Sequence, residues 1–354
     1  MPTPEPVHGF EPVGEDGSDR MPAQPTAQDA QTPPPAQPHT GRRKRPGRMH
    51  REPVFLLVLV TYVLLLGSRF LDTLLTDRGN AYLIVVLLQL MVFIVPAFLY
   101  IRWQEVSFAR DLRLSVFRPD HLLLLFSATV LLVSGGLLIG MLSGGLSSSF
   151  GGYMLYDTFL SHNDGTPAGA IYLILAYAAL PAVCEELIFR GILCADLEKK
   201  IGVPCAVVLS ALFFACLHFN LAQFPVYFYA GVVLCMVMYV TRSLLGALAV
   251  HFLYNLYCVF WQSGFAGFYR TADSLGLLVM ILIGAFLLAA ILFCAEAGRI
   301  YRGWARANKP SDYCGAQVTL REAPRVLLHA AYTPCAVISL LLYLVVVIVR
   351  AILA

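Results

Sequence analysis

The hydropathy pattern divides the chain into a polar N-terminal tail and a series of long apolar runs. Residues 1–50 are rich in Pro, Gln, Asp and Thr, so they cannot bury enough apolar surface to offset the entropy of ordering. Nine apolar runs follow, most of them long enough to cross roughly 30 Å of hydrocarbon at about 20 residues each. They lie at 54–75, 81–101, 121–142, 168–188, 204–222, 225–241, 244–262, 274–295 and 332–353. The pattern predicts an all-α, polytopic membrane helix bundle of about nine transmembrane helices at 51–354, preceded by a disordered tail.

The composition agrees with a protein that lies in lipid. Apolar residues make up 58% of the chain and charged residues 13%, and the mean hydropathy is +0.71. The net charge of +3 is small, and the basic residues cluster beside apolar runs instead of forming a stripe that could track phosphates. We therefore expect the lipid bilayer, and no nucleic acid, as a partner. The nine cysteines are scattered without a CxxC pair, which is typical of small core residues.

The basic residues also predict an orientation. If the N-terminus is cytoplasmic, the segments on the cytoplasmic side hold 20 of the 25 Lys and Arg residues, whereas the outer connection at 143–167 holds none. This asymmetry follows the positive-inside rule. It predicts a multi-pass protein of the cell membrane with a cytoplasmic N-terminus, whose basic residues at 42–51 can touch anionic headgroups.

Ionisable residues inside apolar runs are costly, so the few present mark candidate functional sites. The sequence EELIFR ends the fourth run. Glu186 and Arg190 are four apart and share a helix face, so they can pair, whereas Glu185 is turned about 100° away and stays available. The structural alternative is a charged helix end that reaches toward the headgroups.

Two imidazoles and a carboxamide occur in later runs. His218 ends the sequence FACLH in the fifth run, and His251 and Asn255 stand one turn apart in the sequence HFLYN of the seventh. Each could also be a polar residue that only bonds one helix to another. Together with Glu185 they offer what peptide hydrolysis requires, namely a carboxylate that takes a proton from water and donors that stabilise an oxyanion.

The same donors could hold zinc. Glu185, His218 and His251 would supply three ligands and leave an open position for water. Spacing alone does not decide between this arrangement and a mechanism without metal. The sequence contains no HExxH, GxSxG or Walker motif, so a soluble-type zinc protease, a serine hydrolase and a P-loop protein are not indicated.

Taken together, the three motifs resemble the CPBP family of intramembrane proteases. This family, also called Abi, includes type II CAAX prenyl endopeptidases and bacteriocin-processing or self-immunity proteins. Its pattern of EExxxR, FxxxH and HxxxN or HxxxD stands here in the same order at 185–190, 214–218 and 251–255. One such motif is weak, whereas three in order on separate apolar runs are specific. The resemblance covers about residues 168–262, which would form the catalytic core.

The resemblance implies an intramembrane endopeptidase that acts on a membrane-associated peptide or protein without a cofactor. The catalytic set carried over by position is Glu185, Glu186, Arg190, His218, His251 and Asn255. The first glutamate would activate the water, and the second glutamate and the arginine would support it. The histidines and the asparagine would polarise the carbonyl and steady the oxyanion. A metal-free glutamate mechanism is favoured over the zinc alternative.

Two other classes of function stay open. A non-catalytic membrane scaffold or a bacteriocin self-immunity protein could keep the protease fold, and replacing Glu185 by Gln would distinguish it from a protease. A transporter would need further ionisable residues along a path across the bilayer, and the apolar runs do not supply them.

One feature of the predicted boundaries is inconsistent with a shared site. At 1.5 Å per residue, His218 lies about 20 Å from the start of its run at Pro204, whereas His251 lies about 10 Å from the start of its own. Either the fourth helix continues past Arg190 and the turn at 202–204 dips into the membrane, or the boundaries are wrong by about two turns.

Overall fold

The regular structure of the described residues is helical throughout. The computed structural model describes residues 53–75, 81–105, 112–150, 166–261, 275–307, 316–319 and 321–353. No strand occurs among them, so the predicted all-α fold is confirmed for this part of the chain. The predicted tail at 1–50 and most of the predicted outer connection at 143–167 lie outside the described residues.

Six helical runs are long and apolar enough to cross a membrane. They are Val85–Trp103, Pro119–Ser143, Pro167–Ile201, Phe224–Thr241, Leu275–Arg306 and Pro334–Leu353. Three shorter apolar helices are Pro53–Ser68, Val203–Leu217 and Leu244–Phe260. Each of the nine predicted runs therefore contains an apolar helix, although six of these reach a full span in the described ranges. The chain is a multi-pass membrane protein, and its orientation stays a prediction.

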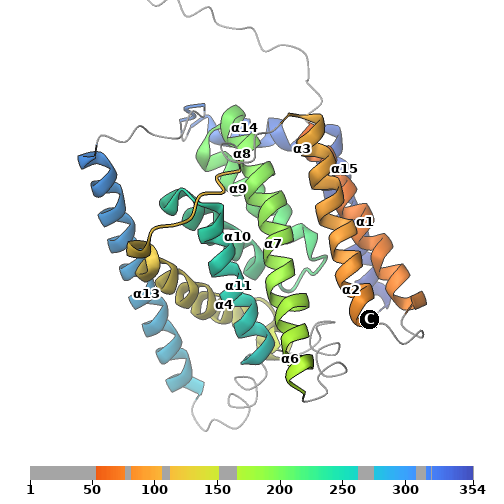
Figure 1. Ribbon diagram of the computed structural model, residues 1–354, viewed down its shortest axis with the longest axis horizontal. Helices are drawn as coiled ribbons and strands as arrows, with labels where there is room; N and C mark the ends of the chain where they lie inside the picture. Colours follow the sequence, from red (N-terminus) through yellow and green to blue (C-terminus); the bar gives the residue numbers. More distant parts are fainter. Residues whose placement is uncertain are drawn as a thin grey trace, which may run out of the picture. The chain divides into compact units, whose positions relative to one another are not determined.

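The helices follow one another as labelled in Figure 1. The first are α1 (Pro53–Leu75), α2 (Ala81–Gln89) and α3 (Val95–Trp103), with a π-helical turn, Leu90–Ile94, between the last two. A 3-10 turn, Pro119–His121, leads into α4 (Leu122–Phe150). The later helices are α9 (Val203–Leu217), α10 (Phe224–Thr241), α11 (Leu244–Phe260), α13 (Leu275–Arg306), α14 (Ala323–Ala331) and α15 (Pro334–Leu353).

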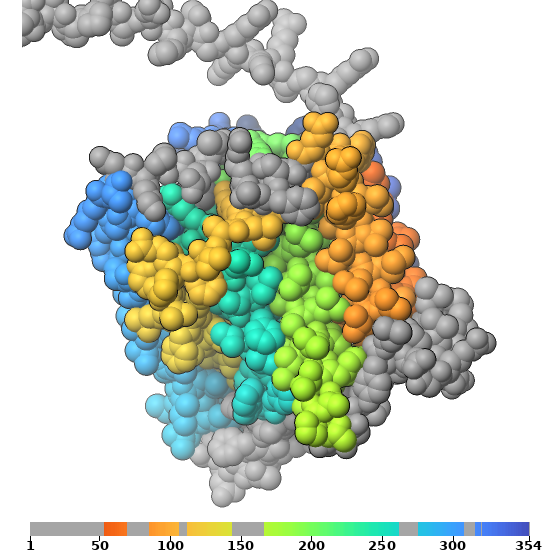
Figure 2. All heavy atoms as spheres, in the orientation of Figure 1, coloured from red at the N-terminus to blue at the C-terminus, as the bar shows by residue number. Residues whose placement is uncertain are grey.

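Between α4 and α9 the chain forms one continuous helical column, in which α-helical and π-helical parts alternate. Its parts are α6 (Pro167–Leu173), the π-helix η4 (Ile174–Ala179), α7 (Leu180–Glu186), the π-helix η5 (Leu187–Cys194) and α8 (Ala195–Ile201). The Thr166 hydroxyl caps its start by accepting from the backbone N–H of Gly169 at 3.1 Å. On the face shown in Figure 2, the column, in green, lies between the teal residues of α11 and the orange residues of α2 and α3.

Side chains of neighbouring helices bond to the π-helical parts of the column. Gln89 and Asn255 each donate a side-chain N–H to a carbonyl of η4, at 3.0 and 3.3 Å. In η5, the carbonyl of Phe189 accepts the hydroxyl of Ser210 at 2.8 Å. A π-helical turn departs from the i→i−4 bonding pattern, and an unsatisfied backbone group in hydrocarbon costs several kcal/mol. These bonds therefore fix α2, α9 and α11 against the column.

Helices α9 and α10 approach each other closely at Gly231. A Cβ added to Gly231 would lie 2.8 Å from both Cα and Cβ of Ala211, so a larger residue does not fit without moving a helix. Small residues allow such close backbone contact between membrane helices. The contact brings the Gly231 carbonyl within 3.4 Å of the Arg190 guanidinium of the column.

Candidate active site

The second glutamate of EELIFR forms a buried ion pair. Glu186 and Arg190 are both 0% exposed, and Nη1 of Arg190 lies 2.7 Å from Oε1 of Glu186. The guanidinium also lies 4.2 Å from the centroid of the Phe214 ring, against its face. The pairing expected from the helical spacing is therefore present, and it lies inside the bundle, not at a helix end near headgroups.

His251 lies between the two glutamates. Its Nδ1 is 2.8 Å from Oε1 of Glu186, and its Nε2 is 3.9 Å from Oε2 of Glu185. One oxygen of Glu186 thus contacts both Arg190 and His251, while the other has no hydrogen-bond partner among the described residues. The buried ion pair therefore fixes the orientation of the imidazole ring. We call Glu185, Glu186, Arg190 and His251 the ionic cluster.

Glu185 is the more accessible carboxylate of the ionic cluster. Its side chain is 13% exposed, compared with 0% for Glu186. The distance of 3.9 Å to His251 is longer than a hydrogen bond. Glu185 therefore stays outside the ion pair of Glu186 with Arg190, as the helical spacing predicts.

The Phe214 ring brings the second histidine to the ionic cluster. The rings of His218 and His251 both meet it edge-on, with centroid distances of 5.1 and 5.9 Å. The His218 ring also stacks on Tyr227 at 3.6 Å with 13° between the planes, and its Nδ1 lies 3.0 Å from the Phe214 carbonyl. One phenylalanine therefore contacts both imidazoles.

Helices α9 and α11 start within one residue of the predicted positions, at Val203 and Leu244, whereas two helix ends differ from the prediction. The column continues past Arg190 to Ile201, instead of ending at 188, and α9 ends at Leu217, instead of at 222. The sequence left two explanations open, and the first correctly stated that the fourth helix continues past Arg190. The reversal between α8 and α9 occurs at Gly202, whose φ of 80° is a conformation that glycine adopts without steric cost.

Asn255 has a contact that differs from those of the ionic cluster. Its Nδ2 donates to the Ala178 carbonyl of η4 at 3.3 Å, one turn beyond His251 on α11. This bond ties α11 to the column, which is the helix-to-helix role that the sequence left open. It occupies one N–H of the carboxamide, which has two.

The part of the chain that carries the three motifs is similar to a known family. Residues 167–257 match the type II CAAX prenyl endopeptidase Rce1-like family. The Rce1-like segment runs from the start of α6 into α11 and contains all three motifs, so the resemblance over about 168–262 is confirmed. It covers roughly a quarter of the chain. Comparison with curated proteins and with solved structures gives no match.

The donors of the Rce1-like segment do not form a metal site in this arrangement. Across the described ranges, no group of three His, Cys, Asp or Glu side chains is placed to hold a metal ion. His218 directs Nδ1 to a main-chain carbonyl and stacks on an aromatic ring, whereas His251 contacts Glu186. The set of Glu185, His218 and His251 proposed for zinc therefore does not converge here.

Sequence reasoning missed two aromatic residues of the Rce1-like segment. Phe214 contacts Arg190 and both histidines, and its position at the start of the FACLH motif was an available signal. Tyr227 stacks on His218, but no local pattern distinguishes it from the other tyrosines of α10. Its role arises because the fold places the start of α10 beside the end of α9.

Proposed function

We propose that the chain is an intramembrane endopeptidase that hydrolyses a peptide bond of a membrane-associated peptide or protein. The observation that carries the proposal is the accessible carboxylate of Glu185, which lies beside an imidazole held in place by a buried ion pair. Incompletely bonded ionisable groups inside an apolar bundle are typical of functional sites. The match to an endopeptidase family over 167–257 supports the same conclusion.

In the proposed reaction, Glu185 acts as the general base. It takes a proton from a water molecule as the water oxygen attacks the carbonyl carbon of the peptide bond. The same proton then passes to the leaving nitrogen as the C–N bond breaks. One water molecule and one peptide bond give a carboxylic acid and an amine, and Glu185 returns to its starting form.

The oxyanion of the tetrahedral intermediate needs hydrogen-bond donors. Imidazole that carries both protons donates from both ring nitrogens; in that form His251 would bond Glu186 through Nδ1 and the oxyanion through Nε2. His218 and the second N–H of Asn255 are the further proposed donors. Glu186 acts through His251, whose ring it contacts, and Arg190 acts through Glu186; both are too buried to meet a substrate.

The function is tested with cells that lack this protein and carry either the wild type or Glu185→Gln. The membrane proteome should contain a peptide or protein that accumulates uncut with Glu185→Gln and is processed with the wild type. Glu198→Gln is the matched control, because Glu198 is a buried carboxylate of the same column outside the ionic cluster. If Glu185→Gln processes every membrane protein as the wild type does, the protein is a scaffold or an immunity factor, and the proposal is wrong.

A further inference from the structure

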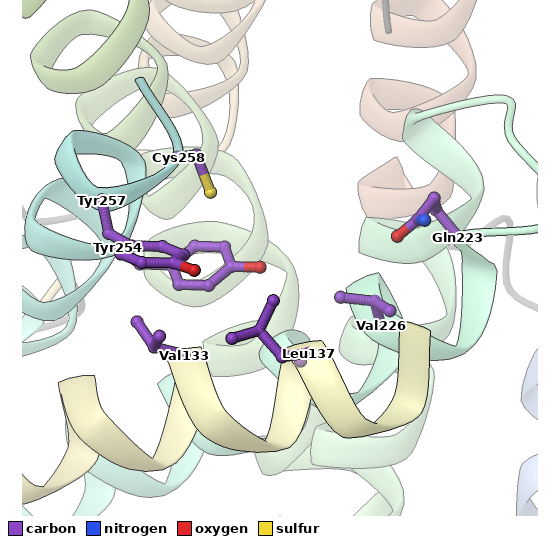
Figure 3. Close-up of a pocket in the computed structure, with 8 residues that line it drawn as sticks. Val133, Leu137, Gln223, Val226, Tyr254, Tyr257 and Cys258 are labelled. Atoms are coloured by element: carbon purple, nitrogen blue, oxygen red, sulfur yellow. The ribbon is translucent and has the colours of Figure 1, made fainter. Parts of the chain in front are cut away.

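A small cavity lies between α4, α10 and α11. Figure 3 shows side chains of these helices around it, with those of α4 on one side. Its volume is about 30 Å³. The polar side chains that line it are Gln223, Tyr254, Tyr257 and Cys258. No charged residue belongs to its lining.

The size and the lining of the cavity select its occupant. The volume of about 30 Å³ is the space open to the centres of water-sized spheres, and one water needs about 10–15 Å³ of such space, so the cavity has room for water. A bound water also needs two to four polar partners. The Tyr257 hydroxyl is buried and has no hydrogen-bond partner among the residues that the structure describes, so it offers an unused donor and acceptor.

The space exists because α4 carries glycine at position 136. A Cβ added to Gly136 would lie 3.3 Å from the Tyr254 hydroxyl and 3.5 Å from Cγ1 of Val226. A larger side chain would therefore extend into the cavity. The contact with Tyr254 also shows that this hydroxyl reaches the α4 side of the cavity.

The cavity and the proposed active site share helix α11, on which Tyr254, Tyr257 and Cys258 of the lining follow His251 by one to two turns. Tyr254 follows His251 by three residues and so lies on nearly the same face of α11, and Val226 is the neighbour in sequence of Tyr227, which stacks on His218. Helix α9 has 15 residues and a length of about 22 Å, less than the roughly 30 Å of a bilayer core. Non-helical backbone at membrane depth is tolerated where it is buried or lines water, which fits the loop at 218–223.

We propose that this cavity is a hydration site that holds one or two water molecules. Each hydrolysed peptide bond consumes one water, and the surrounding helices are apolar, so a water bound one to two helical turns from His251 is positioned to replace it. The role in resupply rests on the proposed protease function. Hydration of the cavity does not depend on it.

The hydration site is tested by X-ray radiolytic footprinting of the full-length protein in lipid nanodiscs. Radicals formed from bound water modify adjacent tyrosine and cysteine side chains, which mass spectrometry quantifies. The reference is Tyr62, which is fully buried and donates its hydroxyl to the Phe213 carbonyl. If water lies against the cavity's polar lining, Tyr257 should be modified faster than Tyr62. Equal rates would overturn the proposal.

Filling the cavity provides the second measurement. Gly136→Val should reduce the labelling of Tyr257. Gly284→Val is the matched control, because an added Cβ there meets no atom within 4 Å, and it should leave the labelling unchanged. If Gly136→Val does not fold, Val133→Leu fills the same cavity with one methylene. Undiminished labelling in a folded cavity-filled variant contradicts the proposal.

Proteolysis measured on the same variants separates this inference from the proposed function. Filling the cavity should lower kcat and leave KM nearly unchanged, because the substrate site is untouched. One outcome is that Tyr257 is not labelled, while the wild type cleaves and Glu185→Gln does not. In that case the proposed hydration of the cavity is wrong and the proposed protease function is supported. If Tyr257 is labelled while Glu185→Gln cleaves as the wild type does, the hydration site stands and its role in catalysis falls.

Discussion

Two buried clusters of this bundle use arginine and glutamate in different ways. In the first, at the end of the column, both oxygens of Glu198 accept from Arg113, at 3.0 and 2.8 Å, and one of them also accepts the hydroxyl of Tyr239 at 3.1 Å. The backbone carbonyl of Arg113 accepts the N–H of Leu244, the first residue of α11. This cluster therefore holds together segments that are distant in the sequence.

The ionic cluster of the candidate site is bonded less completely. Arg190 and His251 share a single oxygen of Glu186, and neither the other oxygen nor Nε of Arg190 has a hydrogen-bond partner within the described ranges. Glu185 beside them meets His251 only at 3.9 Å. Buried polar groups are nearly always satisfied in folded proteins, so a bound water is expected at the unpaired oxygen of Glu186.

The largest expected effect separates the two clusters directly. Glu185→Gln keeps the shape of the side chain but cannot accept a proton, so cleavage of an identified substrate should fall by on the order of 10²–10⁴. Glu198→Gln should keep its activity. Thermal unfolding should show that Glu185→Gln remains folded, and activity within about tenfold of the wild type would contradict the role of a general base.

Replacing each ion pair by apolar residues sharpens the comparison. Glu186→Leu with Arg190→Met removes the contact that orients His251 and should abolish cleavage. Arg113→Met with Glu198→Leu should leave cleavage intact. Replacing a whole buried pair is often neutral for stability, whereas removal of one partner costs about 3–5 kcal/mol, so Glu186→Leu alone should unfold earlier than either double variant. Equal activity losses in both double variants would show that the clusters do not differ in function.

A smaller effect is expected at the edge of the site. Asn255→Leu removes a proposed oxyanion donor, so kcat should fall by about 10². Gln89→Leu is the matched control, since Gln89 makes the equivalent bond to η4 from the other side and should change only stability, by about 0.6 kcal/mol. If Asn255→Leu also changes stability alone, Asn255 is a helix-to-helix bond and not a donor to the oxyanion.

The smallest effect is expected from removal of metal. No three His, Cys, Asp or Glu side chains of the described residues are placed to share a metal ion, so dialysis of the purified protein against a chelator should leave the cleavage rate unchanged. The rate is measured before dialysis, after dialysis, and after zinc is added back. A loss of activity that zinc restores would instead support the ligand set of Glu185, His218 and His251.

Local geometry explains what could be predicted from the sequence. Apolar runs of membrane length predict helices because backbone groups in lipid must bond within their own segment. The pairing of Glu186 with Arg190, and the separate position of Glu185, follow from the 100° rotation per residue of a helix. These properties depend on neighbours within one turn, and the structure contains all of them. The order of the three motifs then indicated the family segment.

Other properties depend on partners that are distant in the sequence. The contact of Glu186 with His251 joins residues 65 positions apart, and no hydropathy pattern specifies it. The helix ends failed for the same reason. Charges after 188 marked the end of an apolar run, yet Arg190 and Glu198 lie buried in the column because each meets a partner of opposite charge. The cost of burying a charge is set by its partner; for Glu198 that partner is the distant Arg113, which only the tertiary structure supplies.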